Sequence, residues 1–159
     1  MAIKKTNLRQ KQVSIQHTFH TIKGFPRHAE KGREEEKRRI IITLSARNQF
    51  AGTVKSVTEG AVNGIVVIDV KGTPVTATIS NEAIKDLGLK AGASATAVIK
   101  ATEVMVGQGS MKISARNKFA GKVASVETGA VNSIVAVETP AFTITATISN
   151  AAVEELGLK

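Results

Sequence analysis

The chain has 159 residues, a formal net charge of +9, 42% hydrophobic residues and no cysteine. The lack of cysteine excludes disulfides, thiolate metal sites and a cysteine nucleophile. No stretch approaches the roughly 20 unbroken apolar residues of a membrane span, and the N-terminus lacks the apolar region of a secretory signal. We therefore expect a cytoplasmic protein that does not enter a membrane.

The positive charge is concentrated in an N-terminal leader. Residues 1–39 hold eleven Lys and Arg against four Glu, a net charge of +7, whereas the other 120 residues carry only +2. The leader has no clear hydrophobic period, so we predict that it is largely disordered. It also contains all three histidines, His17, His20 and His28, so a hydrolytic triad in the body is hard to support and we expect no enzyme.

An internal repeat organises the rest of the chain. SARNQFAGTVKSVTEGAVNGIVVIDV begins at Ser45 and SARNKFAGKVASVETGAVNSIVAVET begins at Ser114, an offset of 69 residues that holds without a gap to the second LGLK. About 27 of 46 aligned positions are identical, so the two copies arose by duplication. We assign residues 40–106 to the first domain, 107–110 to a linker and 111–159 to the second domain.

Each copy is predicted to be mainly β. In the first copy, alternating and β-branched runs predict strands, which Gly and Asn turns separate: Thr53 to Thr58, Ile65 to Val70, Val75 to Ile79 and Ala95 to Lys100. One short helix is predicted from Asn81 to Leu87, capped by Ser80 or Asn81 and stopped by Gly88. The fold class is therefore two tandem OB-like small β-barrels. The second copy ends before its closing strands, so another segment has to complete it or it stays incomplete.

Several residues carry donors that suit a tetrahedral oxyanion, whose oxygens only accept hydrogen bonds. The SARN motif supplies a hydroxyl, a guanidinium and an amide from Ser45, Arg47 and Asn48. Ser80 adds a hydroxyl at a helix N-terminus, and Lys100 adds a mobile charge. Each residue also has a structural interpretation: turn former for Ser45 and Asn48, helix cap for Ser80, and solvated surface lysine for Lys100.

The motifs SARN, GAVN and IKAT at this spacing resemble the molbindin family, also called Mop or TOBE domains, and the two copies resemble its di-domain members. The resemblance covers Ile40 to Lys159. It implies an OB-like fold, six domains per oligomer and therefore a trimer of two-domain chains, with oxyanion sites between domains. It implies storage and homeostasis of molybdate, with tungstate as a substitute. The implied molybdate-binding residues are Ser45, Ala46, Arg47, Asn48, Ser80, Lys100, Ser114, Arg116 and Ser149.

Two questions stay open at this point. The second copy has no counterpart of Lys100, which puts its sites in doubt. The competing interpretation is an OB-like nucleic-acid-binding protein with a basic tail, although the body is near neutral and has no Trp or Tyr on which bases could stack.

Overall fold

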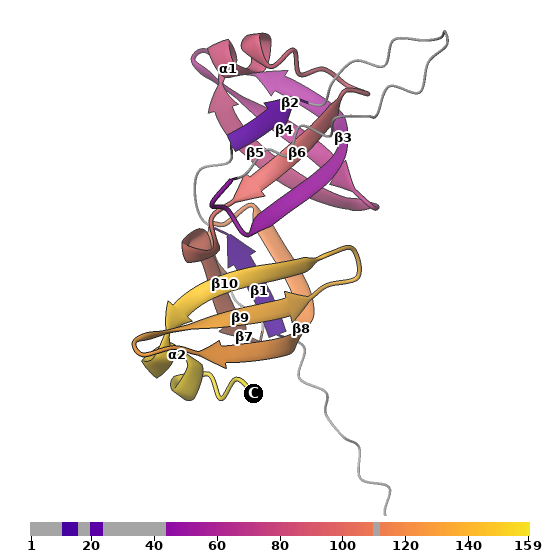
Figure 1. Cartoon of the computed structure of the whole chain (residues 1–159). Helices are drawn as coiled ribbons and strands as arrows, with labels where there is room; N and C mark the ends of the chain where they lie inside the picture. The colour runs from indigo at the N-terminus through magenta and orange to yellow at the C-terminus, as the bar shows by residue number, and fades with distance from the viewer. Residues whose placement is uncertain (1–10, 16–19, 24–43, 110–111) are drawn as a thin grey trace, which may run out of the picture.

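The computed structural model describes residues 11–15, 20–23, 44–109 and 112–159, and these form two stacked β-units (Figure 1). Unit 1 is a five-stranded sheet in the order β2-β6-β3-β4-β5. Its strands are β2 (His20–Lys23), β3 (Asn48–Glu59), β4 (Asn63–Val70), β5 (Thr73–Ser80) and β6 (Ser94–Ile99). Helix α1 (Asn81–Asp86) follows β5 at the outer end of this unit.

Unit 2 is a second five-stranded sheet, in the order β10-β9-β8-β1-β7. Its strands are β1 (Lys11–Ile15), β7 (Val104–Gln108), β8 (Asn117–Thr128), β9 (Asn132–Glu138) and β10 (Thr143–Ser149). Helix α2 (Asn150–Glu155) lies at the opposite end of the molecule from α1. The predicted mainly-β, OB-like fold with one short helix per copy is confirmed.

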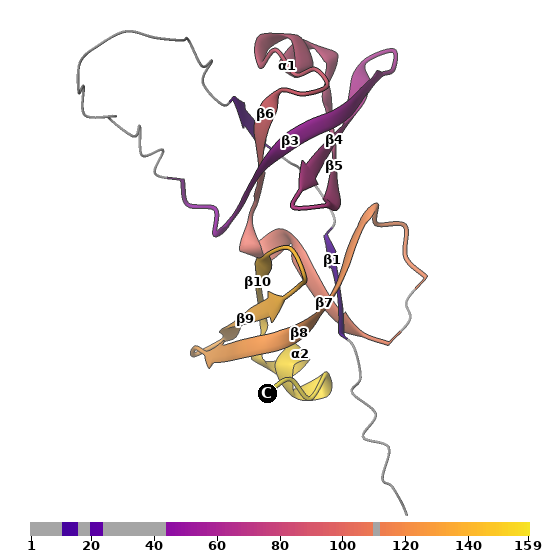
Figure 2. The same ribbon diagram turned by 90° about the vertical axis from the view of Figure 1, so that its right-hand side faces the viewer.

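One strand of the first repeat lies in the sheet of unit 2, which the sequence did not predict. After β6, the short 3-10 helix η1 (Ala101–Glu103) leads into β7, and β7 joins unit 2 rather than unit 1 (Figure 2). The carboxamide of Gln108, at the end of β7, donates to the backbone oxygen of Leu156 beside α2. Gly107 and Gln108, which the sequence analysis assigned to a linker, are the last two residues of β7.

The leader supplies the strands that the repeats lack. Strand β1 lies between β7 and β8, where Ile15 pairs with Asn117 and Lys11 pairs with Gly121. In unit 1 the equivalent pairs are Asn48 with Ile99 and Gly52 with Ala95, so β1 takes the place of β6 in the same register. The prediction of a disordered leader is wrong for β1 and β2, because backbone pairing can order a strand even within a charged segment. Its remaining residues, 1–10, 16–19 and 24–39, lie outside the described residues.

One apolar core runs through both units. It includes the fully buried Val66, Ile68 and Val75 of unit 1 together with Val135, Val137 and Ile144 of unit 2. At the junction the ring of Phe142 stacks on Phe50, with centroids 4.1 Å apart, and meets the edge of Phe119 at 5.0 Å. Phe50 and Phe119 are repeat equivalents, whereas Phe142 replaces Thr73, so a ring without a counterpart in the first repeat contacts both of them.

The repeated FAG motif marks a close approach of two strands. A Cβ atom on Gly52 would lie 2.2 Å from the backbone oxygen of Asp69, and one on Gly121 would lie 2.3 Å from that of Glu138. Both sites lie next to a β-bulge, between Val54 and Ser56 in β3 and between Val123 and Ser125 in β8. Glycine is therefore required because no side chain fits where the bulged strand coils over its neighbour.

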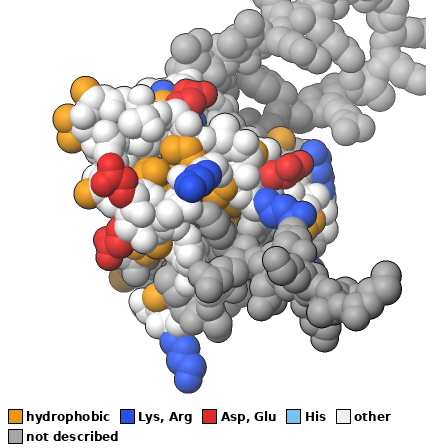
Figure 3. Space-filling model, turned by 90° about the horizontal axis from the view of Figure 1, so that it is seen from below, with side chains coloured by type: hydrophobic (Ala, Val, Ile, Leu, Met, Phe, Trp, Pro, Cys, Tyr) orange, Lys and Arg blue, Asp and Glu red, His pale blue; other side chains and the backbone are white. Residues whose placement is uncertain are grey.

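The surface of the two units is nearly balanced in charge. Residues 44–159 hold eleven Lys and Arg and nine Asp and Glu. Seen from the α2 end, the basic and acidic side chains of the described residues are interspersed with uncharged ones and form no broad basic patch on that face (Figure 3). No helix among the described residues is long and apolar enough to cross a membrane.

Candidate functional site

The two SARN segments are turns at the junction between the units. We call this junction the waist and define it by residues 44–48, 100–103, 114–117 and 142–145. Ser45 and Arg47 are exposed immediately before β3, and Ser114 and Arg116 are exposed immediately before β8. In the first turn the carboxamide of Gln49 donates to the backbone oxygen of Ala46 at 3.1 Å, which closes the turn and leaves the Ser and Arg side chains pointing to solvent.

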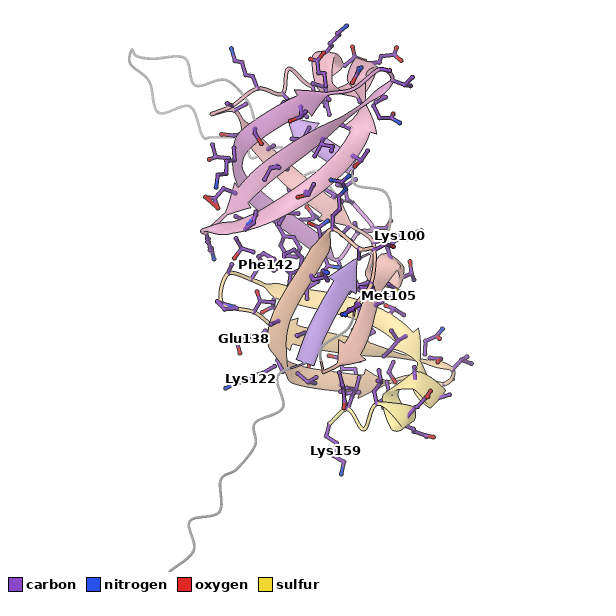
Figure 4. All side chains as sticks on the ribbon, turned by 180° about the vertical axis from the view of Figure 1, so that it is seen from behind. Lys100, Met105, Lys122, Glu138, Phe142 and Lys159 are labelled. Carbon is purple, nitrogen blue, oxygen red and sulfur yellow. The ribbon has the colours of Figure 1, made fainter. Side chains whose placement is uncertain are left out.

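Lys100 lies beside the first turn. The last pair of the β3–β6 ladder joins Asn48 to Ile99, so Lys100 follows on one strand where Arg47 precedes on the other. Lys100 is exposed and precedes η1, which packs against β10. Figure 4 shows it at the waist. The two exposed cations Arg47 and Lys100 therefore flank the last pair of the β3–β6 ladder, and the exposed hydroxyl of Ser45 lies two residues before Arg47 in the chain.

The second turn has a different neighbour. Asn117 pairs with Ile15 of β1, which stands where Ile99 stands in unit 1. The next residue in the sequence is Gln16, which lies outside the described residues. Among the described residues, the second turn has no lysine in the position that Lys100 takes beside the first turn.

Ser80 and Ser149 lie away from the turns of their own units. The Ser80 hydroxyl accepts from the Ala83 amide at 3.1 Å, and the Ser149 hydroxyl accepts from the Ala152 amide at 3.2 Å, so each caps a six-residue helix. These helices mark the two ends of the molecule in Figure 1, whereas the turns lie at the waist. A single chain therefore does not place either serine beside the SARN turn of the same repeat.

Asn48 and Asn117 differ from their neighbours because their side chains are buried, with 2% and 5% of their surface exposed. The Asn48 carboxamide donates to the backbone oxygen of Thr145 at 2.8 Å and accepts from its amide at 2.7 Å. Asn117 makes the same two bonds to Thr76, both at 2.8 Å. Sequence reasoning grouped Asn48 with the oxyanion donors, whereas its oxygen and one of its amide hydrogens are already engaged.

Two further features of the waist were missed. Thr76 and Thr145 were visible as part of the repeated TATISN motif, but nothing in the sequence said that their backbones face the other unit. The equivalent of Phe142 in the first copy is Thr73, so comparing the two copies did not single out Phe142. Among the described residues, no group of three or more His, Cys, Asp or Glu could hold a metal ion.

Comparisons with known proteins identify the family of the chain. The TOBE domain model matches residues 44–106 and 113–159. The chain is 37% identical over 125 residues to the molybdenum transport protein ModE of Herbaspirillum seropedicae, covering 76% of this chain and 46% of that protein, so it spans about half the length of this relative. It is 52% identical over 65 residues to a probable molybdenum-pterin-binding protein of Haemophilus influenzae, covering 40% of this chain and 94% of that one.

A solved structure extends the match to both units. The cytoplasmic molybdate-binding protein ModG, solved with molybdate bound, superposes with a TM-score of 0.71 at 40% identity, covering 74% of this chain and 86% of that one. The resemblance stated from the motifs is confirmed. With two copies of the domain on one shared core, the chain belongs to the TOBE domain family.

Proposed function

We propose that this chain binds molybdate, with tungstate as a close substitute, in the cytoplasm and without catalysing a reaction, so that it stores and buffers the oxyanion. The observation that carries this proposal is that Arg47 and Lys100, both exposed, flank the last pair of the β3–β6 ladder, with the exposed Ser45 two residues before Arg47. A dianion that only accepts hydrogen bonds matches a hydroxyl and two cations. The molybdate-bound ModG relative supports the same ligand.

The complete site is proposed to form between chains. Ser80 and Ser149 are part of the ligand set that the family resemblance implies, yet each lies at the outer end of its unit, away from its own turn. Donors must approach an oxyanion to about 3 Å, so a set that includes these serines and the SARN residues of the same repeat requires a second chain. We therefore propose a trimer, which would have a mass of about 50 kDa from a 16.7 kDa chain. Light scattering measures this directly, and a monomer both with and without molybdate would contradict it.

Calorimetric titration tests the ligand. We expect binding of molybdate and tungstate and much weaker binding of sulfate and phosphate. Ser45→Ala or Lys100→Ala removes one hydrogen bond to the charged oxyanion, worth about 1.5 to 3 kcal/mol, so each should weaken molybdate binding roughly ten- to a hundredfold. Ser114→Ala should cost less, because the sequence of the second copy has no counterpart of Lys100.

The matched control is Lys55→Ala, which removes an exposed lysine at the bulge of β3, away from the waist. Its affinity should equal that of the parent. If Ser45→Ala and Lys100→Ala also bind like the parent, the proposed site is wrong. Binding of nucleic acid that weakens steeply with salt, without any molybdate binding, would favour the competing function instead.

A further inference from the structure

Strands β5 and β10 each lie at the end of a sheet and pair on one side only. In an antiparallel ladder, alternate residues turn their backbone N–H and C=O groups away from the partner strand. Thr76 pairs with Val67, and Thr145 pairs with Ala136. Both threonines direct their backbone groups outward, because those groups bond to Asn117 and Asn48 rather than to the ladder.

The two asparagines act as single peptide groups added to these free edges. A carboxamide presents one C=O and one N–H side by side, as a backbone amide does. Asn48 uses both on Thr145 and Asn117 uses both on Thr76, and the four distances fall between 2.7 and 2.8 Å. The arrangement is reciprocal: the turn of unit 1 is fixed to the edge of unit 2, and the turn of unit 2 is fixed to the edge of unit 1.

This placement bears on the SARN turns directly. Asn48 follows Arg47 in the chain and pairs with Ile99, the residue before Lys100. The Asn48 side chain therefore holds the point where the first SARN turn meets the end of β6, next to Lys100. Its second amide hydrogen has little access to an ion, because only 2% of the Asn48 surface is exposed. Turning the carboxamide toward an ion would leave the Thr145 amide and oxygen without partners, at a cost that the new bond would have to offset.

We propose that Asn48 and Asn117 are positioning residues that hold the oxyanion-binding turns against the edge of the opposite unit, and that neither donates to the ion. The proposal rests on the proposed function for what the turns bind. The hydrogen bonds that Asn48 and Asn117 make to the opposite edge, which we call the clamp, are present in the protein without ligand. Backbone amide exchange can therefore test it separately from molybdate binding.

The experiment compares Asn48→Ala, Asn117→Ala and Lys100→Ala by hydrogen exchange of backbone amides, first without ligand and then after molybdate titration by calorimetry. In Asn48→Ala the protection of the Thr145 amide should fall at least tenfold while that of Thr76 changes little, and Asn117→Ala should show the reverse. Molybdate affinity should fall roughly tenfold in Asn48→Ala. Lys100→Ala should lose affinity with both amides still protected.

A near-isosteric variant keeps the test decisive if the alanine variants do not fold. Asn48→Asp presents two acceptors to Thr145 when ionised, but one acceptor and one donor when protonated, as the amide does. Its molybdate affinity and its protection factor at Thr145, corrected for the intrinsic exchange rate, should therefore recover together as the pH is lowered. The parent should show no such recovery.

Three results would overturn the proposal. Unchanged protection of Thr145 in both Asn48 variants would show that no clamp operates. A loss of affinity in Asn48→Ala with full protection of Thr145 would identify Asn48 as a direct ligand, as would a molybdate-induced shift of its side-chain NH₂ resonances that equals the shift of the Ser45 amide. If the parent fails to bind molybdate while the exchange pattern appears as expected, the proposed function fails and the clamp stands as a docking device only.

Discussion

One buried oxygen in unit 1 lacks the partner that its repeat equivalent has in unit 2. The side-chain oxygen of Asn81 is buried and has no hydrogen-bond partner. Its equivalent on Asn150 is 2.7 Å from the hydroxyl of Ser133. The residue equivalent to Ser133 is Gly64, which has no side chain to offer. The other bond of this amide is the same in both units: it donates to Gly60 at 2.8 Å in one and to Gly129 at 2.9 Å in the other.

The missing hydroxyl cannot simply be added. A Cβ atom on Gly64 would lie 2.4 Å from Cδ1 of Ile84, an atom that the equivalent Val153 lacks. We expect Gly64→Ser alone to cost about 1–3 kcal/mol through overpacking. Ile84→Val alone should cost about 1 kcal/mol through the lost methylene. The double variant removes the clash and satisfies the oxygen, a gain of about 1–3 kcal/mol, and should therefore be as stable as the parent or more stable by up to about 2 kcal/mol.

The informative quantity is the coupling free energy between the two substitutions. Urea unfolding of the parent, both single variants and the double variant at one protein concentration gives this value, and we expect at least about 2 kcal/mol. Additive effects would show that the clash with Ile84 is not what excludes a side chain at position 64. Gly64→Ser as stable as the double variant would likewise refute the reasoning.

Two further predictions concern the waist and the leader. Phe142→Thr, which installs the residue found at position 73, removes contacts to both Phe50 and Phe119. We expect urea unfolding to show a free energy of unfolding lower by about 2–3 kcal/mol. A decrease below about 0.5 kcal/mol would contradict the shared core. Deleting residues 1–23 removes β1 and β2 and leaves β7 and β8 without their common partner; the melting temperature should fall by several degrees at least, with faster amide exchange in β8 and unchanged exchange in β4. An unchanged melting curve would show that β1 adds nothing to unit 2.

The sequence predicted the parts of the fold that local pattern controls. Alternation predicted the strands, and Ser80 with Gly88 predicted the helix, which the structure bounds at Asn81–Asp86. The pairing of β7 in unit 2 and the insertion of β1 escaped prediction because they are long-range pairings. In β1 the run KQVSI alternates only weakly, and its strand form depends on the slot between β7 and β8 rather than on its own propensity.

The candidate site was predictable in composition but not in arrangement. Ser45, Arg47 and Lys100 were selected as donors, and in the structure Arg47 and Lys100 flank the last pair of the β3–β6 ladder. The repeat showed that Asn48 was retained in both copies, yet retention did not reveal whether its amide faced an ion or a backbone. That distinction depends on where β10 lies, and only the packing of unit 2 on unit 1 fixes it.

The insertion of β1 has a consequence for how the chain folds. Lys11 pairs with Gly121, so the sheet of unit 2 closes only after a loop of about 110 residues has been brought together, whereas β3, β4 and β5 pair with sequence neighbours. During synthesis β1 emerges well before β8, while β3 offers it an equivalent slot until β6 arrives. We therefore expect a non-native pairing of β1 with β3 to compete with folding, and escape from it to set the slow step of refolding.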